Sequence, residues 1–592
     1  MIISNFSLGW QNKARHELMK DNALFMCRDM SLIELGSLSC RRLNLENSYF
    51  ATQTYTSPID NVFQVDVEGV NKRLIFYTVG TTLYCWNSAS GQTRTISTAI
   101  TGEHVSYAPL KPLLDTHTYV FITDGVSLLA DNGSTTKTWG LDAPENTTLV
   151  AMAGAGGNLS AGAYVYKYTF YDGDTGSESS PSPASASTTA AANDLATVSQ
   201  ILTSSDSRIT KRRLYRTLVG GGTCYLVAPI NDNVTTTYED GLADADLTTE
   251  LETDNSIPPS GDVVVVYKDR LFIAGDSNYP NRTSYTRAEL PDSCPVTYYL
   301  DVGTSDNKVM NAVEFEGKLY FVHEAMITGL YGSDPDTYAW HQTRSHLGTV
   351  ARWSVAVGPD GIYFVGHDGV YRFDGLKSVR VSDPIGRAFD LTSGTWHEIV
   401  DQDTVAIVSR ACFLQGVYYV LLPMYNVDGS TNNRVLAYDT FNQTWMQYDL
   451  NVSFIMADEG RGKLYGCMEK PDAAGYYSVY ELLSVDGSTV DIPVPQALTK
   501  SFPIVGPREE GNAPAVGWLR KFRVDAQGDW TLKFYVDGTL KHTEVLSGLD
   551  ESDRYKWYDF PAQVKGRFIY VHVQATGTPA PMTHAFWEVE VV

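Results

Sequence analysis

The sequence predicts an all-β protein, a β-propeller of about seven blades with an inserted β-sandwich and a C-terminal β-sandwich. The main observation is a phrase that recurs along the chain, made of a strand, a turn with Gly or Asp-Gly, and a second strand rich in Tyr. Most copies follow one another at 43 to 55 residues, the length of a four-stranded propeller blade. Helix signals are almost absent, apart from a short one at 384–389.

The recurring phrase appears seven times. Its copies have their second residue at Leu74, Tyr119, Leu271, Leu319, Ile362, Val417 and Leu464. The intervals between neighbouring copies are 45, 152, 48, 43, 55 and 47 residues. The long interval exceeds the others by about a hundred residues, which is room for one inserted domain. The blade count stays open, because the N-terminal arm could supply a closing strand or pair with a neighbouring molecule.

The N-terminal arm lacks the recurring phrase of the blades and has a different sequence pattern. Asn5–Trp10 is extended, residues 14–30 could hold a short helix or a turn, and residues 31–42 alternate as a strand does. Blade-type sequence begins near Ile59.

The inserted domain begins after a flexible Gly-rich entry at 153–157. Tyr164–Tyr171 is a strand, Gly176–Pro183 is an irregular loop, and Pro258-Pro259 stops any further strand. The enclosed length of about 100 residues is typical of a β-sandwich.

The C-terminal part alternates with period two in Trp518–Val524, Trp530–Gly538 and Arg567–Val573, as strands with one buried face do. A second β-sandwich is therefore predicted. The five predicted segments are an N-terminal arm (1–58), a first set of propeller blades (59–160), an inserted fibronectin-like β-sandwich (161–258), a second set of blades (259–495) and a C-terminal β-sandwich (496–592).

Bulk composition excludes several classes of protein. The net charge is −24, from 69 acidic and 45 basic side chains, which argues against a surface that wraps DNA. The seven cysteines show no CxxC pair, so neither a disulfide framework nor a zinc site is predicted. The first twenty residues lack the apolar run of a secretory signal, and no apolar stretch is long enough to span a membrane.

Two phrases invite comparison with sialidase-type and kelch-type blades, Tyr438–Trp445 and Asp131…Trp139. A blade hairpin with Asp in its turn and Trp packed beneath it has the same sequence, and we adopt this structural interpretation. A sialidase would also need several arginines around a carboxylate. Arg41-Arg42 and Lys211–Arg213 are neighbours on strands, so their side chains point to opposite faces.

The other candidates also have plain structural interpretations. Asp172–Glu178 has the closely spaced oxygens of some calcium loops but lacks the rest of that pattern, so an acidic turn is favoured. Lys211–Arg213 with Arg216 could contact nucleic acid or an acidic neighbour, and a solvated strand is the simpler interpretation. We therefore predict no catalytic, cofactor-binding or metal-binding residue, no cofactor and no enzymatic activity. The histidines, each interpreted as a single satisfied side chain, are His323, His341, His346 and His367.

Taken together, several motifs make the chain similar to a known family, the β-propeller tail nozzle (tail tubular, or hub) proteins of short-tailed bacteriophages. The resemblance covers most of residues 1–490. Its motifs are Asn5–Trp10, Glu34–Arg42, Tyr164–Thr169, Gly176–Pro183, Leu214–Thr217, Pro258-Pro259, Lys268–Phe272, Gly348–Val355, Gly361–Val365, Asp368–Gly375 and the Ser-Asp-Pro-Ile segment at 382–385.

This resemblance implies a structural virion protein, made in the host cytoplasm and built into the phage tail. Proteins of this family sit below the portal and adaptor rings, usually as hexamers, and form the channel through which DNA leaves. The implied partners are other copies of the chain, the adaptor or head-tail connector protein, tail fibres or spikes, and genomic DNA that passes without specific binding. Carboxylates along such a channel would repel phosphates and let the duplex slide.

Two alternatives stay open at this stage. A receptor-binding or glycan-cleaving tail component could also use a propeller with sandwich insertions. A trimeric receptor-binding protein would usually show a fibrous or coiled-coil N-terminus, and none is visible. A cellular propeller that scaffolds other proteins would not need an atypical N-terminal arm of about fifty residues.

Overall fold

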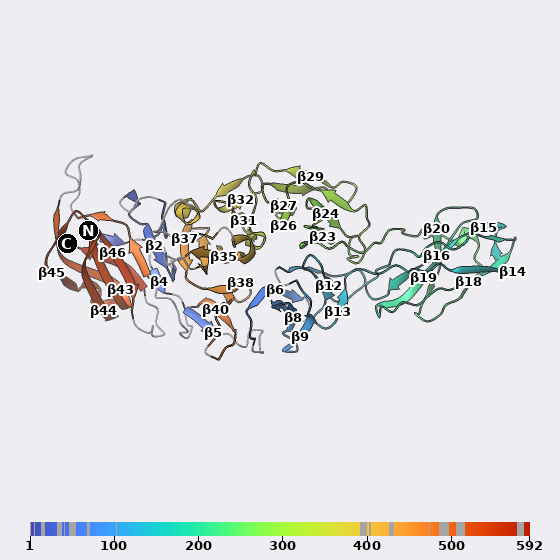
Figure 1. Ribbon diagram of the computed structural model, residues 1–592, viewed down its shortest axis with the longest axis horizontal. Coiled ribbons are helices and arrows are strands. Elements are labelled where there is room, and N and C mark those ends of the chain that lie inside the picture. The colour runs from blue at the N-terminus through green and yellow to red at the C-terminus, as the bar shows by residue number, and fades with distance from the viewer. Residues whose placement is uncertain are drawn as a thin grey trace. The chain divides into compact units, whose positions relative to one another are not determined.

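The computed structural model is all-β, with strands along most of the described chain and only short helices of three to seven residues (Figure 1). The helical elements with defined bounds are η2 (Asp244–Asp246), η3 (Arg352–Ser354), η4 (Asp383–Phe389), α1 (Val405–Val408) and η5 (Glu551–Tyr555). Thus the short helix expected at 384–389 is present as η4. None of the helices in the described part of the chain has the length and hydropathy of a membrane crossing. The structure describes residues 2–4, 6–13, 18–31, 38–40, 42–45, 55–67, 72–101, 104–390, 400–401, 404–425, 431–472, 474–484, 496–504, 516–576 and 585–592.

Sheets of four strands recur along the chain. Among the described residues, six separate sheets have four strands each, and a further run of four, β34 to β37, lies at the end of a larger sheet. In chain order the sheets contain β6 (Ile59–Val67), β7 (Lys72–Val79), β8 (Thr82–Asn87) and β9 (Gln92–Ser97); β10 (Ser106–Leu110), β11 (Tyr119–Thr123), β12 (Leu128–Asp131) and β13 (Thr136–Thr138); β22 (Val263–Tyr267), β23 (Arg270–Ala274), β24 (Arg282–Tyr285) and β25 (Tyr299–Asp301); β26 (Val309–Phe315), β27 (Lys318–His323), β28 (Ile327–Tyr331) and β29 (Ala339–Gln342); β30 (Ala356–Gly358), β31 (Gly361–Gly366), β32 (Gly369–Phe373) and β33 (Ser378–Arg380); β34 (Arg410–Leu414), β35 (Val417–Tyr425), β36 (Thr431–Asp439) and β37 (Thr444–Tyr448); and β38 (Val452–Asp458), β39 (Lys463–Met468), β40 (Val479–Ser484) and β5 (Arg42–Leu45).

The recurring phrase of the sequence forms the second strand of each of these sheets. β31 is buried along its whole length, and it pairs antiparallel with β30 and β32. Several of the turns that precede these second strands use residues with positive φ, as at Glu316-Gly317 and Gln415-Gly416. A two-residue type I′ hairpin turn needs positive φ at both central positions, which explains the Gly in these turns.

The last of these sheets takes its fourth strand from the N-terminal arm. β5 pairs antiparallel with β40, with Leu45 opposite Tyr480 and Asn44 opposite Glu481. The sequence left open whether the arm supplies a closing strand or pairs with a neighbouring molecule. The structure shows that it supplies β5 to the last four-stranded sheet of its own chain.

Strands near the two termini meet in the C-terminal part of the fold. β43 is twenty residues long; its first half pairs with β45 and β47, and its second half with β44 and β46. β1 and β4 pair with β47, whereas β2 lies between β37 and β41. The strand predicted at 31–42 is split into parts of β3, β4 and β5, and residues 32–37 and 41 lie outside the described residues. The strands are β1 (Ile2–Ser4), β2 (Leu24–Arg28), β3 (Met30–Ser31), β4 (Leu38–Cys40), β41 (Gln496–Thr499), β42 (Phe502–Pro503), β43 (Gly517–Val536), β44 (Thr539–Leu549), β45 (Trp557–Gly566), β46 (Phe568–Ala575) and β47 (Ala585–Val591).

The inserted segment forms three small sheets, in the orders β14-β18-β21, β15-β17 and β16-β19-β20. They enclose their own core, in which Tyr164, Tyr166 and Tyr168 are fully buried. β14 pairs with β18 of the inserted segment, although β14 lies before residue 161, where the inserted β-sandwich was predicted to begin. The exact start of the inserted domain stays a prediction. The strands are β14 (Leu149–Leu159), β15 (Gly162–Tyr164), β16 (Tyr166–Asp172), β17 (Thr188–Ala190), β18 (Asp194–Ser199), β19 (Ile209–Thr217), β20 (Cys224–Ile230) and β21 (Tyr238–Asp240).

The Ser-Pro loop after β16 is ordered along the edge of that strand. The backbone N–H groups of Ser179, Ser182 and Ser185 donate to the carbonyl oxygens of Phe170, Tyr168 and Tyr166 at 2.8 to 3.0 Å. Each serine hydroxyl in turn accepts the N–H of the same β16 residue at 2.9 to 3.0 Å. A serine at every third position therefore satisfies an edge that would otherwise be open to another strand. We call residues 179–185 the serine cover.

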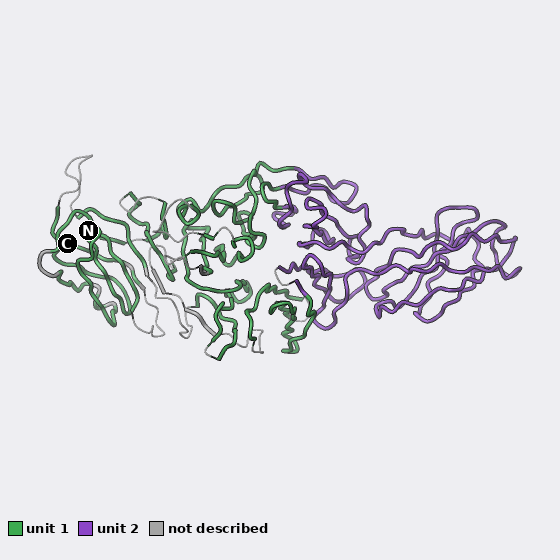
Figure 2. The backbone as a smooth tube through the Cα atoms, viewed as in Figure 1, with its two compact units in different colours: residues 1–99, 322–327, 342–592 green, residues 100–321, 328–341 purple. Residues whose placement is uncertain are grey.

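The chain divides into two compact units (Figure 2), which are residues 1–99, 322–327 and 342–592, and residues 100–321 and 328–341. In unit 1 the first strands β30, β34, β38 and β6 of four sheets contact one another in this order. In unit 2 the first strands β10, β22 and β26 do the same.

Candidate functional site

The aspartate of the Tyr438–Trp445 phrase lies in the turn between β36 and β37. The Asp439 carboxylate accepts the backbone N–H groups of Phe441 at 2.9 Å and Asn442 at 3.1 Å. Trp445 is fully buried, and its indole N–H donates to the carbonyl of Val381 at 3.0 Å. The carboxylate thus holds its own turn and the indole packs in the core, which confirms the structural interpretation of this phrase.

The Asp131…Trp139 phrase has the same construction in β12 and β13. Asp131 is buried and accepts the backbone N–H of Gly133 at 2.7 Å and the hydroxyl of Thr136 at 2.6 Å. The buried Trp139 donates its indole N–H to the carbonyl of Pro291 at 2.6 Å. The predicted hairpin is therefore present, and its aspartate is occupied in holding it.

The basic run in β19 is largely buried, so the interpretation of this run as a solvated strand was wrong. Arg212 and Arg216 lie on the same face, as strand alternation predicts, but they are fully buried and the strand is not solvated there. Arg212 binds Asp232 at 2.9 Å, and Arg216 binds the buried Asp240 at 2.7 Å and Asp244. A buried guanidinium needs such partners because the loss of hydration is costly. These arginines hold the inserted segment together and are not available to nucleic acid.

The acidic turn at 172–178 is occupied by internal contacts. The buried Asp172 accepts the backbone N–H of Asp174 at 2.9 Å, and burial raises the pKa of its carboxyl. Glu178 accepts from Thr169 at 2.6 Å, from Tyr215 at 2.7 Å and from Arg213 at 2.8 Å. Its oxygens are therefore part of a side-chain network, in agreement with an acidic turn.

The four histidines do not form one group. His323 is fully buried at the end of β27, whereas His341, His346 and His367 are exposed on β29, in the following loop and in the turn after β31. His341 packs edge-on against Tyr331, with ring centroids 4.9 Å apart. Within the described ranges, no three His, Cys, Asp or Glu side chains lie close enough to hold a metal ion.

Sequence reasoning missed a buried aspartate that joins the inserted segment to the blade-type sheets of unit 2. Asp292 is 1% exposed; it accepts the N–H of Gly140 at 2.8 Å and the hydroxyl of Ser177 at 3.0 Å. The guanidinium of Arg208 lies 3.6 Å and the ammonium of Lys137 3.8 Å from the same carboxylate. Because Ser177 is 115 residues away in the chain, no local pattern marks this contact.

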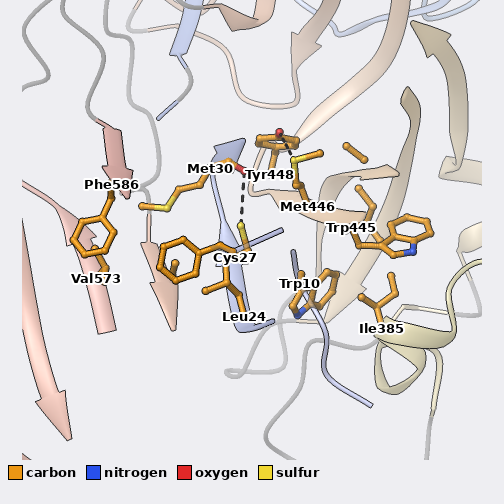
Figure 3. Packing of buried hydrophobic residues seen from close by; sticks show 14 of the residues in the cluster. Trp10, Leu24, Cys27, Met30, Ile385, Trp445, Met446, Tyr448, Val573 and Phe586 are labelled. Atoms are coloured by element: carbon orange, nitrogen blue, oxygen red, sulfur yellow. Dashed lines mark hydrogen bonds between the residues drawn. The ribbon is translucent and has the colours of Figure 1, made fainter. Parts of the chain in front are cut away.

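The N-terminal motif at Asn5–Trp10 also contributes to packing. The backbone N–H of Trp10 donates to the carbonyl of Trp445 at 2.9 Å, and the N–H of Leu24 donates to the carbonyl of Gly9 at 2.9 Å. The indole of Trp10 lies in the same buried cluster as Leu24 and Ile385 (Figure 3). Of the other residues quoted for this part of the chain, Asn5, Glu34 and Arg41 lie outside the described residues.

Comparison with known proteins identifies no relative. No protein-family model matches the chain, and no curated protein matches it. The solved structures that match include a glycoside hydrolase, at 10% identity over 91% of this chain and 98% of that chain, with a TM-score of 0.21. They also include PorZ of Porphyromonas gingivalis, at 13% identity over 75% of this chain and 52% of that chain, with a TM-score of 0.19. An exo-beta-1,3-galactanase from Phanerochaete chrysosporium matches at 8% identity over 67% of this chain and 99% of that chain, with a TM-score of 0.18. Scores this low carry no argument about fold or activity.

Proposed function

We propose that the chain is a structural virion protein, the tail nozzle or hub of a short-tailed bacteriophage, built as a seven-bladed propeller with an inserted and a C-terminal β-sandwich. The observation that carries the proposal is the succession of four-stranded sheets. It is interrupted once, by the inserted segment, and its last sheet is completed by β5 from the N-terminal arm. This is the layout that the resemblance to the nozzle proteins implies.

The order of the first strands supports a propeller in both compact units. Four first strands follow one another in unit 1 and three in unit 2. A propeller arranges its blades radially around such first strands, so the two runs would supply four and three consecutive blades. A strand from the N-terminal arm that completes the last blade would close the ring, because it ties the two ends of the blade series together.

The chemistry of the candidate residues supports a structural role. The side chains that the sequence offered for catalysis or nucleic-acid binding, Asp131, Asp439, Arg212 and Arg216, hold turns or buried ion pairs. In the proposed assembly several copies, six in the form we favour, surround a channel for the genome. The net charge of −24 would then keep the duplex from adhering, because like charges repel. The adaptor and the tail fibres or spikes would bind at the two ends of the ring.

Imaging of the purified full-length chain tests this proposal. We expect closed rings with a central channel in negative-stain electron microscopy, with sixfold symmetry. Incubation of the same preparation with polysaccharide from the surface of host bacteria gives the second measurement. Monomeric or trimeric particles that release sugar would overturn the nozzle proposal and favour the glycan-cleaving tail component.

A further inference from the structure

A buried carboxyl group lies where the N-terminal strands join the rest of unit 1. Asp29 connects β2 to β3 in a left-handed backbone conformation, with φ of 57°, and is 3% exposed. Its backbone N–H donates to the carbonyl of Gln447 at 2.8 Å, and its Oδ1 accepts the N–H of Asp449 at 2.7 Å. Its Oδ2 is buried and has no hydrogen-bond partner. One oxygen of this carboxyl thus accepts a hydrogen bond, and the other has no hydrogen-bond partner.

The segment that carries Asp29 joins two parts of one sheet. We call residues 18–31 the N-terminal strap. Its strand β2 pairs with β37 on one side and with β41 on the other, so it links the β34–β37 run to the C-terminal strands. Three side chains of the strap, those of Leu24, Cys27 and Met30, lie almost completely buried in the core of unit 1 (Figure 3). Only one residue pair, Arg28 and Gln447, connects β2 to β37 in register, so this side of the strap has few backbone contacts to lose.

The charged and titratable groups that face Asp29 come from the adjoining strand β2, from β36 and from the residue that follows β37. Burial raises the pKa of its carboxyl to about 8; the N–H of Asp449 opposes the shift, the Asp449 carboxylate adds to it, and the guanidinium groups of Arg28 and Arg434 oppose it. The thiol of Cys27, next to it in the strap, has its own pKa raised to about 12, by burial and by Asp29. Asp29 is therefore held mainly as the neutral acid at pH 7 in the folded chain.

We propose that the N-terminal strap is a pH-sensitive clasp, locked by Asp29, that is held most tightly in acid and opens more readily toward neutral pH. The direction follows from linkage. In the open strap the carboxyl is hydrated and ionises at about its ordinary pKa of 3.9. The stabilisation is complete below about pH 4, is lost as the pH rises from there to about 8, and does not change further above the pKa of the folded state. The opening equilibrium should rise about tenfold per pH unit within this window.

The thiol of Cys27 gives a direct report on opening, because it is buried while the strap is closed. The experiment uses the full-length chain and the variant Asp29→Asn, which keeps an oxygen to accept the N–H of Asp449 but does not titrate. The rate at which Cys27 reacts with 4,4′-dithiodipyridine is followed from pH 5 to 9, and the modified peptide is identified by mass spectrometry. The ionisation of the exposed thiol is the same in both proteins, so it cancels in the ratio of their rates.

We expect the ratio of the native rate to the Asp29→Asn rate to rise about tenfold per pH unit between pH 5 and 7 and to level off above pH 8. A ratio that stays constant over this range would overturn the proposal. Cys467 serves as a control thiol in the native chain, since it is fully buried in β39 and burial raises the pKa of its thiol to about 11. If the variant does not fold, the ratio of Cys27 to Cys467 reactivity in the native chain decides. A parallel rise at both thiols would mean that unit 1 opens as a whole, and would also overturn the clasp.

Discussion

Single residues in this chain show how a charged side chain becomes part of a core. Arg216 and Asp240 are both fully buried, and the guanidinium also donates to the carbonyl of Leu242 at 2.7 Å. The hydroxyl of Tyr166 donates to the same Asp240 carboxylate at 2.8 Å. The desolvation of the two charges is offset only as long as all of these partners are present.

Replacement of Arg216 by Met tests this dependence. The variant leaves Asp240 buried and without its cation, so we expect the inserted segment to lose about 3–5 kcal/mol of stability. Local stability is measured by hydrogen exchange around each substitution, at the β16 and β19 amides for Arg216→Met and at the β24 and β25 amides for Arg282→Met. Arg282→Met is the matched control, because its ion pair with Asp301 is partly exposed and such pairs contribute about 1 kcal/mol or less. Equal losses in the two variants would contradict this account of the buried pair.

Gly348 opens one of the motifs of the resemblance, Gly348–Val355, and the structure shows why a glycine fits there. A Cβ at this position would collide with the carbonyl oxygen of His323, which is backbone and can move little. We expect Gly348→Ala to lower the stability of unit 1 by about 1–3 kcal/mol, as overpacking does. Urea unfolding of the variant measures the loss. Gly222→Ala is the control, since a Cβ there meets nothing within 4 Å; the same loss in both variants would argue against a steric cause.

At the scale of an element, the serine cover shows how an irregular segment protects a strand. Tyr168 has both its backbone groups bound by Ser182, through the amide at 2.8 Å and the hydroxyl at 3.0 Å. The cover thereby satisfies the backbone groups of β16 that β19 does not reach.

Ser182→Ala removes the hydroxyl that accepts the N–H of Tyr168. A buried N–H left without an acceptor costs about 1–3 kcal/mol, so the amide of Tyr168 should exchange roughly ten- to a hundredfold faster. Hydrogen exchange detected by mass spectrometry on peptides from β16 provides the measurement. Ser187→Ala, at an exposed position beyond the cover, should leave these rates unchanged. Unchanged exchange in both variants would mean that the cover does not protect β16.

The strands were largely predictable, because local alternation and turn chemistry specify them. The phrase around Ile362 predicted a strand, a turn with Asp-Gly and a second strand, and both strands are present as β31 and β32. The strap was not: residues 14–30 suggested a helix or turn, but Leu24–Arg28 is the strand β2. Its conformation depends on pairing with β37 and β41, more than 400 residues away in the chain, and no local window contains that information.

The candidate sites were predictable only in part for the same reason. The Asp439 turn holds itself through residues two and three positions later, so its structural role could be inferred from sequence. The ion partners of Arg212 and Arg216, Asp232 and Asp240, lie 20 and 24 residues away and were not anticipated. Asp29 carries no sequence signal, because its burial is produced by strands that the chain supplies much later.

At the scale of the whole molecule, the pairing of β5 with β40 is the contact on which closure of the last sheet depends. Replacement of both Asn44 and Leu45 by Pro removes two successive backbone donors from β5. Neighbouring N–H groups of an edge strand point alternately toward its partner and away, so one of the two faces β40. We expect this variant to expose β40 and to be cut there by a protease at least tenfold faster than the native chain, because the edge of the sheet is no longer covered. Limited proteolysis with peptide mapping follows the cut. Asn44→Ala is the control and should behave as the native chain does; resistance of the proline variant would show that β40 is held without β5.

The pairings of β5 with β40 and of β1 with β47 have a consequence for biosynthesis. Residues 42–45 leave the ribosome early, but their partners at 479–484 are made more than 430 residues later. At about 5–20 residues per second, an interval on the order of twenty seconds to a minute and a half separates the two. During translation β5 therefore stays without its partner, whereas the inserted segment, whose strands are all encoded within 149–240, can fold as soon as it emerges. The nascent protein should mature from the middle outward, and the seam between its distant segments should close last.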